Sequence, residues 1–213
     1  MWKSTPAGGP ERVVALADGV FAIAITLLVL DFSVPSGLDS SAYHAALRDL
    51  APNLGAYVLS LLVLGLFWRD HRRIFGLVER VDGQVITLSL AGLGVAALVP
   101  FPTKLISEYG DEPVSVAVYA AAIAALGASH VALLAVLATR PWLCGGTAPE
   151  EGFLLFGLDM AATTVVFALS VPLALAVGPA AMWSWLVLVP VQGLLGRWAM
   201  RARRGAVNRA ARD

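Results

Sequence analysis

Long apolar runs dominate the chain and recur at the length expected of membrane-spanning helices. A helix needs about 20 mostly apolar residues to cross about 30 Å of hydrocarbon. Six stretches meet this requirement, and short connections rich in proline, glycine or charge separate them. We therefore expect an all-α integral membrane protein, with six transmembrane helices in a single domain over residues 1–213. The predicted spans are 13–34, 51–68, 84–106, 113–138, 153–177 and 179–199.

The composition agrees with this interpretation. Of the 213 residues, 58% are hydrophobic and 14% are charged, whereas about a quarter of a typical soluble domain is charged. The connections between the spans are too short to hold a separate soluble domain. Cys144 is the only cysteine, so the chain cannot form an intrachain disulfide.

The basic residues predict the orientation of the spans. With the N-terminus inside, only Arg48 and Lys104 of the 15 lysine and arginine residues fall outside. Such an excess is typical of short cytoplasmic flanks. We expect a multi-pass protein of the cell membrane with both termini cytoplasmic. Its basic C-terminal tail then anchors the topology and does not bind nucleic acid.

Two charges stand at the entrance of the first span. Arg12 opens it, and Asp18 follows within the first two apolar turns. A buried aspartate in a membrane is costly, so Asp18 requires a partner or a water-filled path.

The same span carries a stripe of residues on one side. At about 100° per residue, Gly19, Ile23, Thr26 and Leu30 share a narrow stripe with Arg12 at its start. Several copies of such a helix meeting on an axis would line a narrow pore. Ordinary helix packing is the alternative, and periodicity alone favours it because this helix is apolar all round.

The run RVVALADGVFAIAITLLVLDFSVP resembles the first helix of the prokaryotic TMEM175 potassium-channel family, whose motif is RxxxFSDG. Arg12, Asp18 and Gly19 match the motif, while Leu16 and Ala17 replace its Phe and Ser.

The resemblance continues into the next two spans. The run LFWRDHRRIFGLVERVDG carries the family's Trp and HxxxF pattern as Trp68, His71 and Phe75, and PFPTKL contains its Pro-Phe pair. Ser89 stands where the family often has Asn. The similarity is close over about the first half of the chain and extends to the second half in hydropathy and length.

This resemblance implies a six-helix subunit, four copies of which form a homotetramer around a pore made by their first helices. It places the narrow hydrophobic constriction at Ile23, with Thr26 and Leu30 as the next pore-facing layers and Gly19 also lining the pore. It further implies a structural polar network that holds the first helix against the second and third. The network residues are Arg12, Asp18, Trp68 and His71.

The expected function is a potassium-permeable channel. The chain has no TVGYG segment, so a filter of backbone carbonyls is not expected. A ring of Ile23 side chains would instead gate the pore by drying and wetting, and Thr26 would offer hydroxyls to the ion. We expect weak to moderate preference for K⁺ over Na⁺, no cofactor, no bound metal, and as partners only further copies, lipid and monovalent cations.

Two other functions remain open. A proton-linked transporter or proton leak would use Asp18, His71, His130 or Asp159, because intramembrane ionisable groups are the usual proton carriers. A structural or assembly protein would have no flux of its own. An enzyme is not expected, since the chain contains no HExxH, no GxSxG and no metal-ligand spacing.

Later spans give three further expectations. The third span should stop at Pro100 and Pro102. Asp159 in the fifth span should face a basic partner inside the protein. The arginines after Trp68 should point to water or lipid headgroups, namely Arg69, Arg72, Arg73 and Arg80.

Overall fold

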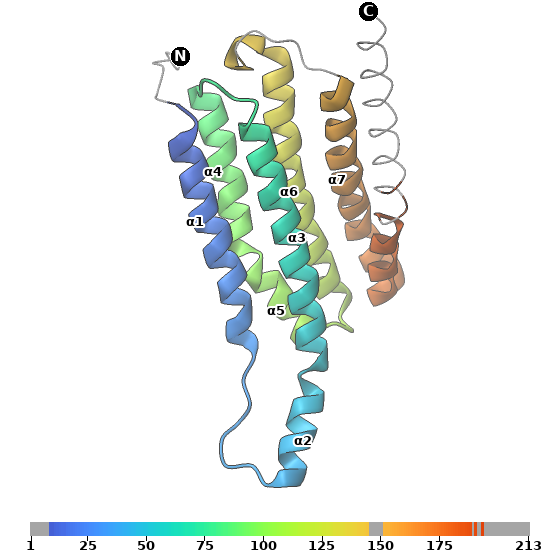
Figure 1. Ribbon diagram of the computed structural model, residues 1–213. Helices are drawn as coiled ribbons and strands as arrows, with labels where there is room; N and C mark the ends of the chain where they lie inside the picture. Colours follow the sequence, from blue (N-terminus) through green and yellow to red (C-terminus); the bar gives the residue numbers. More distant parts are fainter. Residues whose placement is uncertain (1–8, 145–150, 189, 191–192, 194–213) are drawn as a thin grey trace, which may run out of the picture.

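A computed structural model describes residues 9–144, 151–188, 190 and 193. In this part of the chain, long helices run side by side as a bundle (Figure 1). The long helices are α1 (Glu11–Leu27), α3 (Ala51–Phe75), α4 (Gly83–Leu98), α6 (Pro113–Thr139) and α7 (Glu151–Val177). Shorter elements connect them, namely η1 (Leu28–Asp31), α2 (Ser40–Asp49), α5 (Pro100–Glu108), η2 (Pro141–Cys144) and η3 (Gly178–Val187).

The predicted spans correspond closely to the helices. Within the described residues, five helical segments are long and apolar enough to cross a membrane. The sixth predicted span, 179–199, lies partly outside the described residues, and its first part lies in η3, which ends at Val187. Gly178 takes a positive φ of 74° at the end of α7, a conformation that glycine adopts without steric cost. The fold class is all-α and the protein is a multi-pass membrane protein, while the count of six spans stays a prediction.

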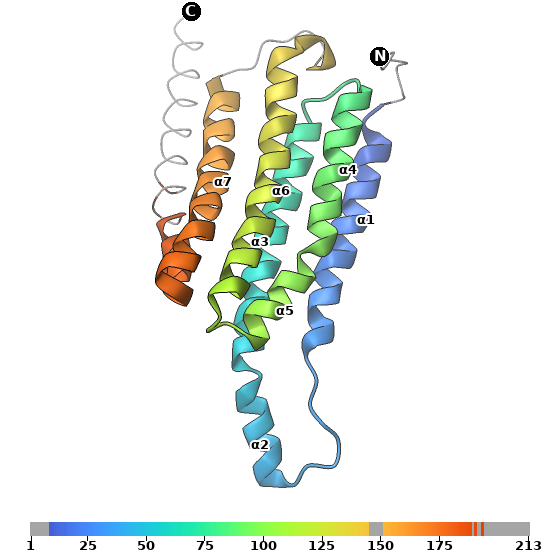
Figure 2. The same cartoon turned by 180° about the vertical axis from the view of Figure 1, so that it is seen from behind.

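The helix of the third span ends at its prolines, as predicted, because α4 ends at Leu98 and a new helix, α5, begins at Pro100. Val99 keeps right-handed helical angles, and Pro100 opens α5 directly after α4. Proline is tolerated at the first position of a helix because its missing N–H has no partner there in any case. The two prolines therefore redirect the chain, and α5 continues at an angle to α4 (Figure 2).

The helix α6 occupies the centre of the bundle and packs against α4 and α7. Two glycines let these neighbours approach closely. A Cβ added at Gly127 would overlap Thr164 on α7, and one at Gly92 of α4 would overlap Ser129 on α6. Small residues at such positions are how transmembrane helices gain close packing.

A buried chain of hydroxyls connects three helices in the opposite half of the bundle from the start of α1. Ser60 on α3 lies 2.8 Å from the Thr103 hydroxyl on α5 and 3.1 Å from the Tyr119 hydroxyl on α6. Because water is absent from the hydrocarbon, these groups must satisfy one another, and the contacts hold α3, α5 and α6 in register.

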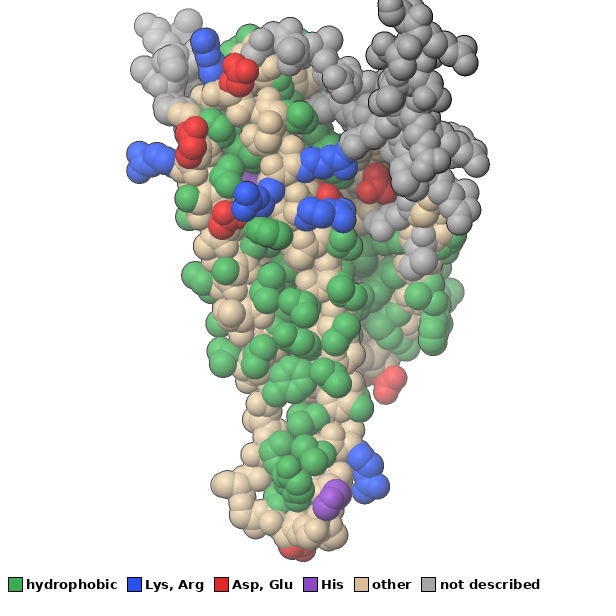
Figure 3. Space-filling view, in the orientation of Figure 1, with side chains coloured by type: hydrophobic (Ala, Val, Ile, Leu, Met, Phe, Trp, Pro, Cys, Tyr) green, Lys and Arg blue, Asp and Glu red, His purple; other side chains and the backbone are tan. Residues whose placement is uncertain are grey.

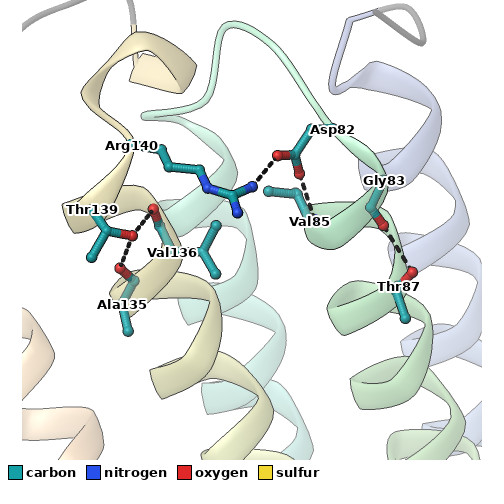
Figure 4. Close-up of polar contacts among 8 residues, drawn as sticks. All are labelled: Asp82, Gly83, Val85, Thr87, Ala135, Val136, Thr139 and Arg140. Carbon is teal, nitrogen blue, oxygen red and sulfur yellow. Dashed lines mark hydrogen bonds and ion pairs between the residues drawn. The ribbon is translucent and has the colours of Figure 1, made fainter. Parts of the chain in front are cut away.

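The end of the bundle where α1 begins carries most of the basic side chains and is called the basic end here (Figure 3). Asp82 caps α4 there, its carboxylate accepting from Val85 N at 2.9 Å and pairing with Arg140 at the end of α6 (Figure 4). The amides of Glu79 and Arg80 donate to Leu143 O at 2.9 and 3.2 Å. These contacts fasten the α3–α4 connection to η2.

Candidate functional site

One face of α1 is fully packed inside the bundle. Ala17, Phe21 and Ala24 of α1, and Leu28 at the start of η1, are each at most 2% exposed, and α1 contacts α3 and α4. Their spacing of three and four residues places them on one side of the helix. Two alanines in this set let the neighbouring helices come close.

The opposite face of α1 has no partner within the described chain. The side chains of Ile23 and Leu30 are 61% and 73% exposed, and Gly19 and Thr26 are exposed with them. At about 100° per residue, this stripe is centred about 160° from the buried face. The predicted stripe is therefore the surface that α1 turns away from its own bundle.

The hydroxyl of Thr26 donates a hydrogen bond within its own helix. Its Oγ1 donates to the carbonyl of Ile23 at 2.9 Å, one turn earlier in the same helix. A hydroxyl that donates once still has lone pairs that accept. On the exposed face of α1, this oxygen can therefore coordinate a cation.

Asp18 joins the start of α1 to α3. Its carboxylate accepts from Trp68 Nε1 at 2.7 Å and lies 3.6 Å from Arg72. The Arg72 guanidinium also lies 5.5 Å from the centre of the Trp68 ring. Arg72 was expected to point to water or lipid headgroups; its side chain is 53% exposed, but one turn of α3 also brings it beside Trp68 and Asp18.

Arg12 and His71 are the other two residues of the predicted network, and the charge of Asp18 acts on His71. Arg12 is exposed near the start of α1. His71 is 2% exposed, and its ring lies 6.3 Å from Phe21 and 4.6 Å from Phe75. His71 therefore contacts the packed face of α1 through its ring. The roles of Arg12 and His71 in a network with Asp18 stay predictions.

His71 also meets a second buried histidine that sequence reasoning did not pair with it. His130 on α6 is 2% exposed, and the two ring centres are 5.5 Å apart. His130 Nδ1 lies 3.0 Å from Leu126 O. The Nε2 atoms of both histidines have no hydrogen-bond partner in the described part of the chain. Only the relative position of α3 and α6 brings them together, and no sequence spacing encodes that position.

Two carboxylates lie further along α3 and α7. Asp70 accepts from Arg69 at 3.1 Å, so Arg69 also has a protein partner where water was expected. Arg69 and Arg73 act electrostatically on Asp159, yet Asp159 Oδ1 accepts no hydrogen bond in the described part of the chain. Asp159 therefore has the basic neighbours that were predicted, but neither of them donates a hydrogen bond to its Oδ1.

No group of three metal-ligating side chains occurs within the described residues. Cys144 lies outside the membrane-spanning segments, where burial and the nearby Glu79 raise the pKa of its thiol. A raised pKa disfavours the thiolate, which is the form that binds metals and attacks electrophiles.

The first part of the chain matches the model of a known protein family. Residues 12–100 match the family described as the endosomal/lysosomal potassium channel TMEM175. A potassium channel of Streptomyces collinus is 43% identical over 126 residues, covering 57% of this chain and 61% of that protein. A potassium channel of Chamaesiphon minutus is 36% identical over 142 residues, covering 64% and 66%. The human endosomal/lysosomal proton channel TMEM175 is 37% identical over 114 residues, covering 48% of this chain and 22% of that protein.

The fold comparison extends over more of the chain. The crystal structure of a lysosomal potassium-selective channel TMEM175 homolog from Chamaesiphon minutus superposes with a TM-score of 0.72 at 26% identity, covering 89% of this chain and 97% of that one. By sequence, the chain spans 61% to 66% of the length of the two bacterial relatives above. These relatives are named as channels and not as enzymes, in agreement with the expectation from sequence. Residues 12–100 thus form a TMEM175 family segment, within a chain that has the fold of a TMEM175 channel homolog.

Proposed function

We propose that the chain is the subunit of a potassium-permeable ion channel whose pore is lined by α1 from each of four copies. The exposed stripe of α1, directly opposite its packed face, carries this proposal. In a symmetric assembly, the same stripe from each copy faces the axis. Gly19, Ile23, Thr26 and Leu30 then line the path of the ion. The names of the bacterial relatives support potassium as that ion.

Ile23 forms the constriction in this proposal. It lies about one turn before the end of α1, and its side chain is 61% exposed. A ring of isoleucine side chains excludes water when narrow, and such dry constrictions close channels. A shift or rotation of α1 that widens the ring admits water and ions. Thr26, one turn away, then offers a ring of hydroxyl oxygens to a partly dehydrated cation.

The expected selectivity is weak to moderate. A ring of apolar side chains presents few fixed dipoles, so little distinguishes K⁺ from Na⁺ except the cost of partial dehydration. The test is the reversal potential of the purified protein in a planar bilayer with K⁺ on one side and Na⁺ on the other. A shift towards the K⁺ equilibrium potential supports the proposal, whereas current with no shift removes selectivity for potassium.

The constriction has its own test. Replacing Ile23 with asparagine, Ile23→Asn, should raise the single-channel conductance several-fold and lower the preference for K⁺, because the polar ring stays wet. Leu169→Asn is the matched control, since Leu169 is 64% exposed on α7 and should leave both properties unchanged. Unchanged conductance and selectivity in Ile23→Asn would exclude Ile23 as the constriction.

Proton transport is the second candidate function, and the buried histidine pair favours it. His71 and His130 each keep an Nε2 without a hydrogen-bond partner in the described residues, and several animal relatives are named proton channels. Under symmetric K⁺ and a pH gradient, this function predicts a current that follows the proton gradient and disappears in Asp159→Asn or His130→Phe. A current that ignores the pH gradient excludes it.

The proposed orientation has the basic end in the cytoplasm of the cell and both chain termini there. By their places in the helices, Arg69, Arg72, Arg73 and Arg140 lie at this end, while Arg48 and Lys104 lie at the other. This asymmetry is the one that short cytoplasmic flanks carry. Monovalent cations, the lipid bilayer and further copies of the chain are the partners in this proposal.

A further inference from the structure

A cavity of about 210 Å³ lies between α3 and α7. Its apolar residues follow one another at three- and four-residue spacing on each helix, so each helix contributes a single face. The cavity therefore runs along the helices as a groove. Its apolar walls come from Leu59, Leu62 and Leu66 on α3, and from Met160 and Phe167 on α7.

The groove has one polar end. Arg69, Asp70 and Asp159 line it where α3 and α7 approach the basic end of the bundle. The remaining length, from Leu66 to Leu59 on α3, rises about 10 Å along the helix axis. A groove with charges at one end and apolar walls parallel to the membrane normal matches an amphiphilic molecule in shape and polarity.

The polar end keeps unused hydrogen-bonding groups, although the charges of Arg69 and Arg73 offset those of Asp70 and Asp159. Arg69 pairs with Asp70 at 3.1 Å, and its side chain remains 61% exposed. Asp159 Oδ1 is buried and accepts no hydrogen bond in the described residues. The polar end thus presents an exposed guanidinium with donors to spare and a carboxylate that lacks a donor.

We propose that this groove binds a phospholipid with a primary-ammonium headgroup, phosphatidylethanolamine in chemical terms. Its phosphate accepts from Arg69, its ammonium donates to Asp159, and one acyl chain lies along the apolar walls. Arginine suits phosphate because its planar guanidinium offers several donors. The basic end is also the level at which phospholipid headgroups stand beside a membrane protein.

Charge complementarity favours this lipid over phospholipids with other headgroups. Phosphatidylcholine carries the same phosphate, but its quaternary nitrogen has no N–H to give Asp159. Phosphatidylglycerol carries no cation at all. A second copy of the chain could instead cover the groove, and lipid would then be excluded from it.

The test measures lipid binding to the purified full-length chain, independently of ion flux. Native mass spectrometry with added phosphatidylethanolamine, phosphatidylcholine or phosphatidylglycerol of identical acyl chains gives the relative affinities. We expect the ethanolamine lipid to bind about tenfold more tightly than the choline lipid, the scale of one hydrogen bond to a charged group. Asp159→Asn should abolish this preference, and Arg69→Gln should weaken both lipids.

Two further variants complete the design. Asp111→Asn removes an exposed carboxylate at the other end of the bundle and should change nothing. Leu62→Trp fills the groove and should weaken all three lipids, which keeps the test sharp if Asp159→Asn fails to fold. Equal affinities of the wild-type protein for the ethanolamine and choline lipids would overturn the proposal. So would unchanged binding in Leu62→Trp, the outcome expected if another copy covers the groove.

Discussion

At the scale of single residues, the two departures from the family motif have opposite environments. Ala17, in place of Ser, is 1% exposed and lies in the packed face of α1. A serine there would bury a hydroxyl that requires a partner, and alanine removes the requirement. Leu16, in place of Phe, is 47% exposed and changes the outward face of the helix. The contact of Asp18 with Trp68 depends on neither residue.

The indole N–H of Trp68 is the atom that fastens α1 to α3 at Asp18. Trp68→Phe keeps the ring and removes this donor, so we expect the free energy of unfolding to fall by about 1 kcal/mol, in the range of one hydrogen bond at a partly exposed site. The thermal midpoint in detergent should fall accordingly. Trp142→Phe is the control, since Trp142 is half exposed in η2, and an equal fall in both variants would contradict this account.

The sequence predicts some of these contacts and omits others for physical reasons. The resemblance to the family places Asp18 beside Trp68. The contact of Arg72 with Trp68 could also have been predicted, because the two residues are four apart on a helix and share a face. The contact between His71 and His130 could not have been predicted from the sequence. It depends on how α3 is rotated against α6, and the packing of the whole bundle determines that rotation.

At the scale of helices, the contact between α6 and α7 is the most extensive in the bundle. It depends on a glycine, because a Cβ at Gly127 would overlap Thr164. The Thr164 hydroxyl donates to Met160 O at 2.8 Å, so it cannot turn away without losing that bond. The two helices must separate to admit any side chain at residue 127.

Gly127→Ala should therefore lower the free energy of unfolding by about 1–3 kcal/mol, the usual cost of overpacking. Gly65→Ala is the matched control, because a Cβ at Gly65 meets nothing within 4 Å. Alanine is favoured over glycine inside a helix by about 0.5–1 kcal/mol, so this variant should be at least as stable as the parent. Thermal midpoints that move in the same direction would show that Gly127 has no special role.

Helix positions were predictable because the length of an apolar run is set by the thickness of the membrane. The ends of α3 and α6 follow the apolar runs and their flanking charges. The break at Pro100 was predictable, but the helix α5 that follows it was not, because a proline ends one helix or begins the next with the same local sequence. Only the packing of α5 against α3 and α6 decides between these outcomes.

At the scale of the whole molecule, the exposed stripe of α1 predicts where copies of the chain meet. Cys144 is the only cysteine, so a Cys144→Ser background leaves no thiol. In that background, Leu30→Cys should form disulfide-linked dimers on mild oxidation, because Leu30 is 73% exposed at the end of the stripe and its copies would approach one another near the axis.

The control places the cysteine on another exposed face, as Leu169→Cys on α7. This variant should stay monomeric on a denaturing gel under the same oxidation. Cross-linking of Leu169→Cys but not of Leu30→Cys would move the contact between copies away from α1 and would also remove the basis for Ile23 as the constriction.

The helix α2 and the connection that precedes it extend beyond the bundle as a hairpin (Figure 1). None of the α2 residues is buried, so the transmembrane bundle gains little stability from them. Segments that bury no core tolerate inserted residues best. The hairpin is therefore the natural place to graft an affinity tag or an antibody epitope, and such a graft would leave the folding of the membrane-embedded helices unaltered.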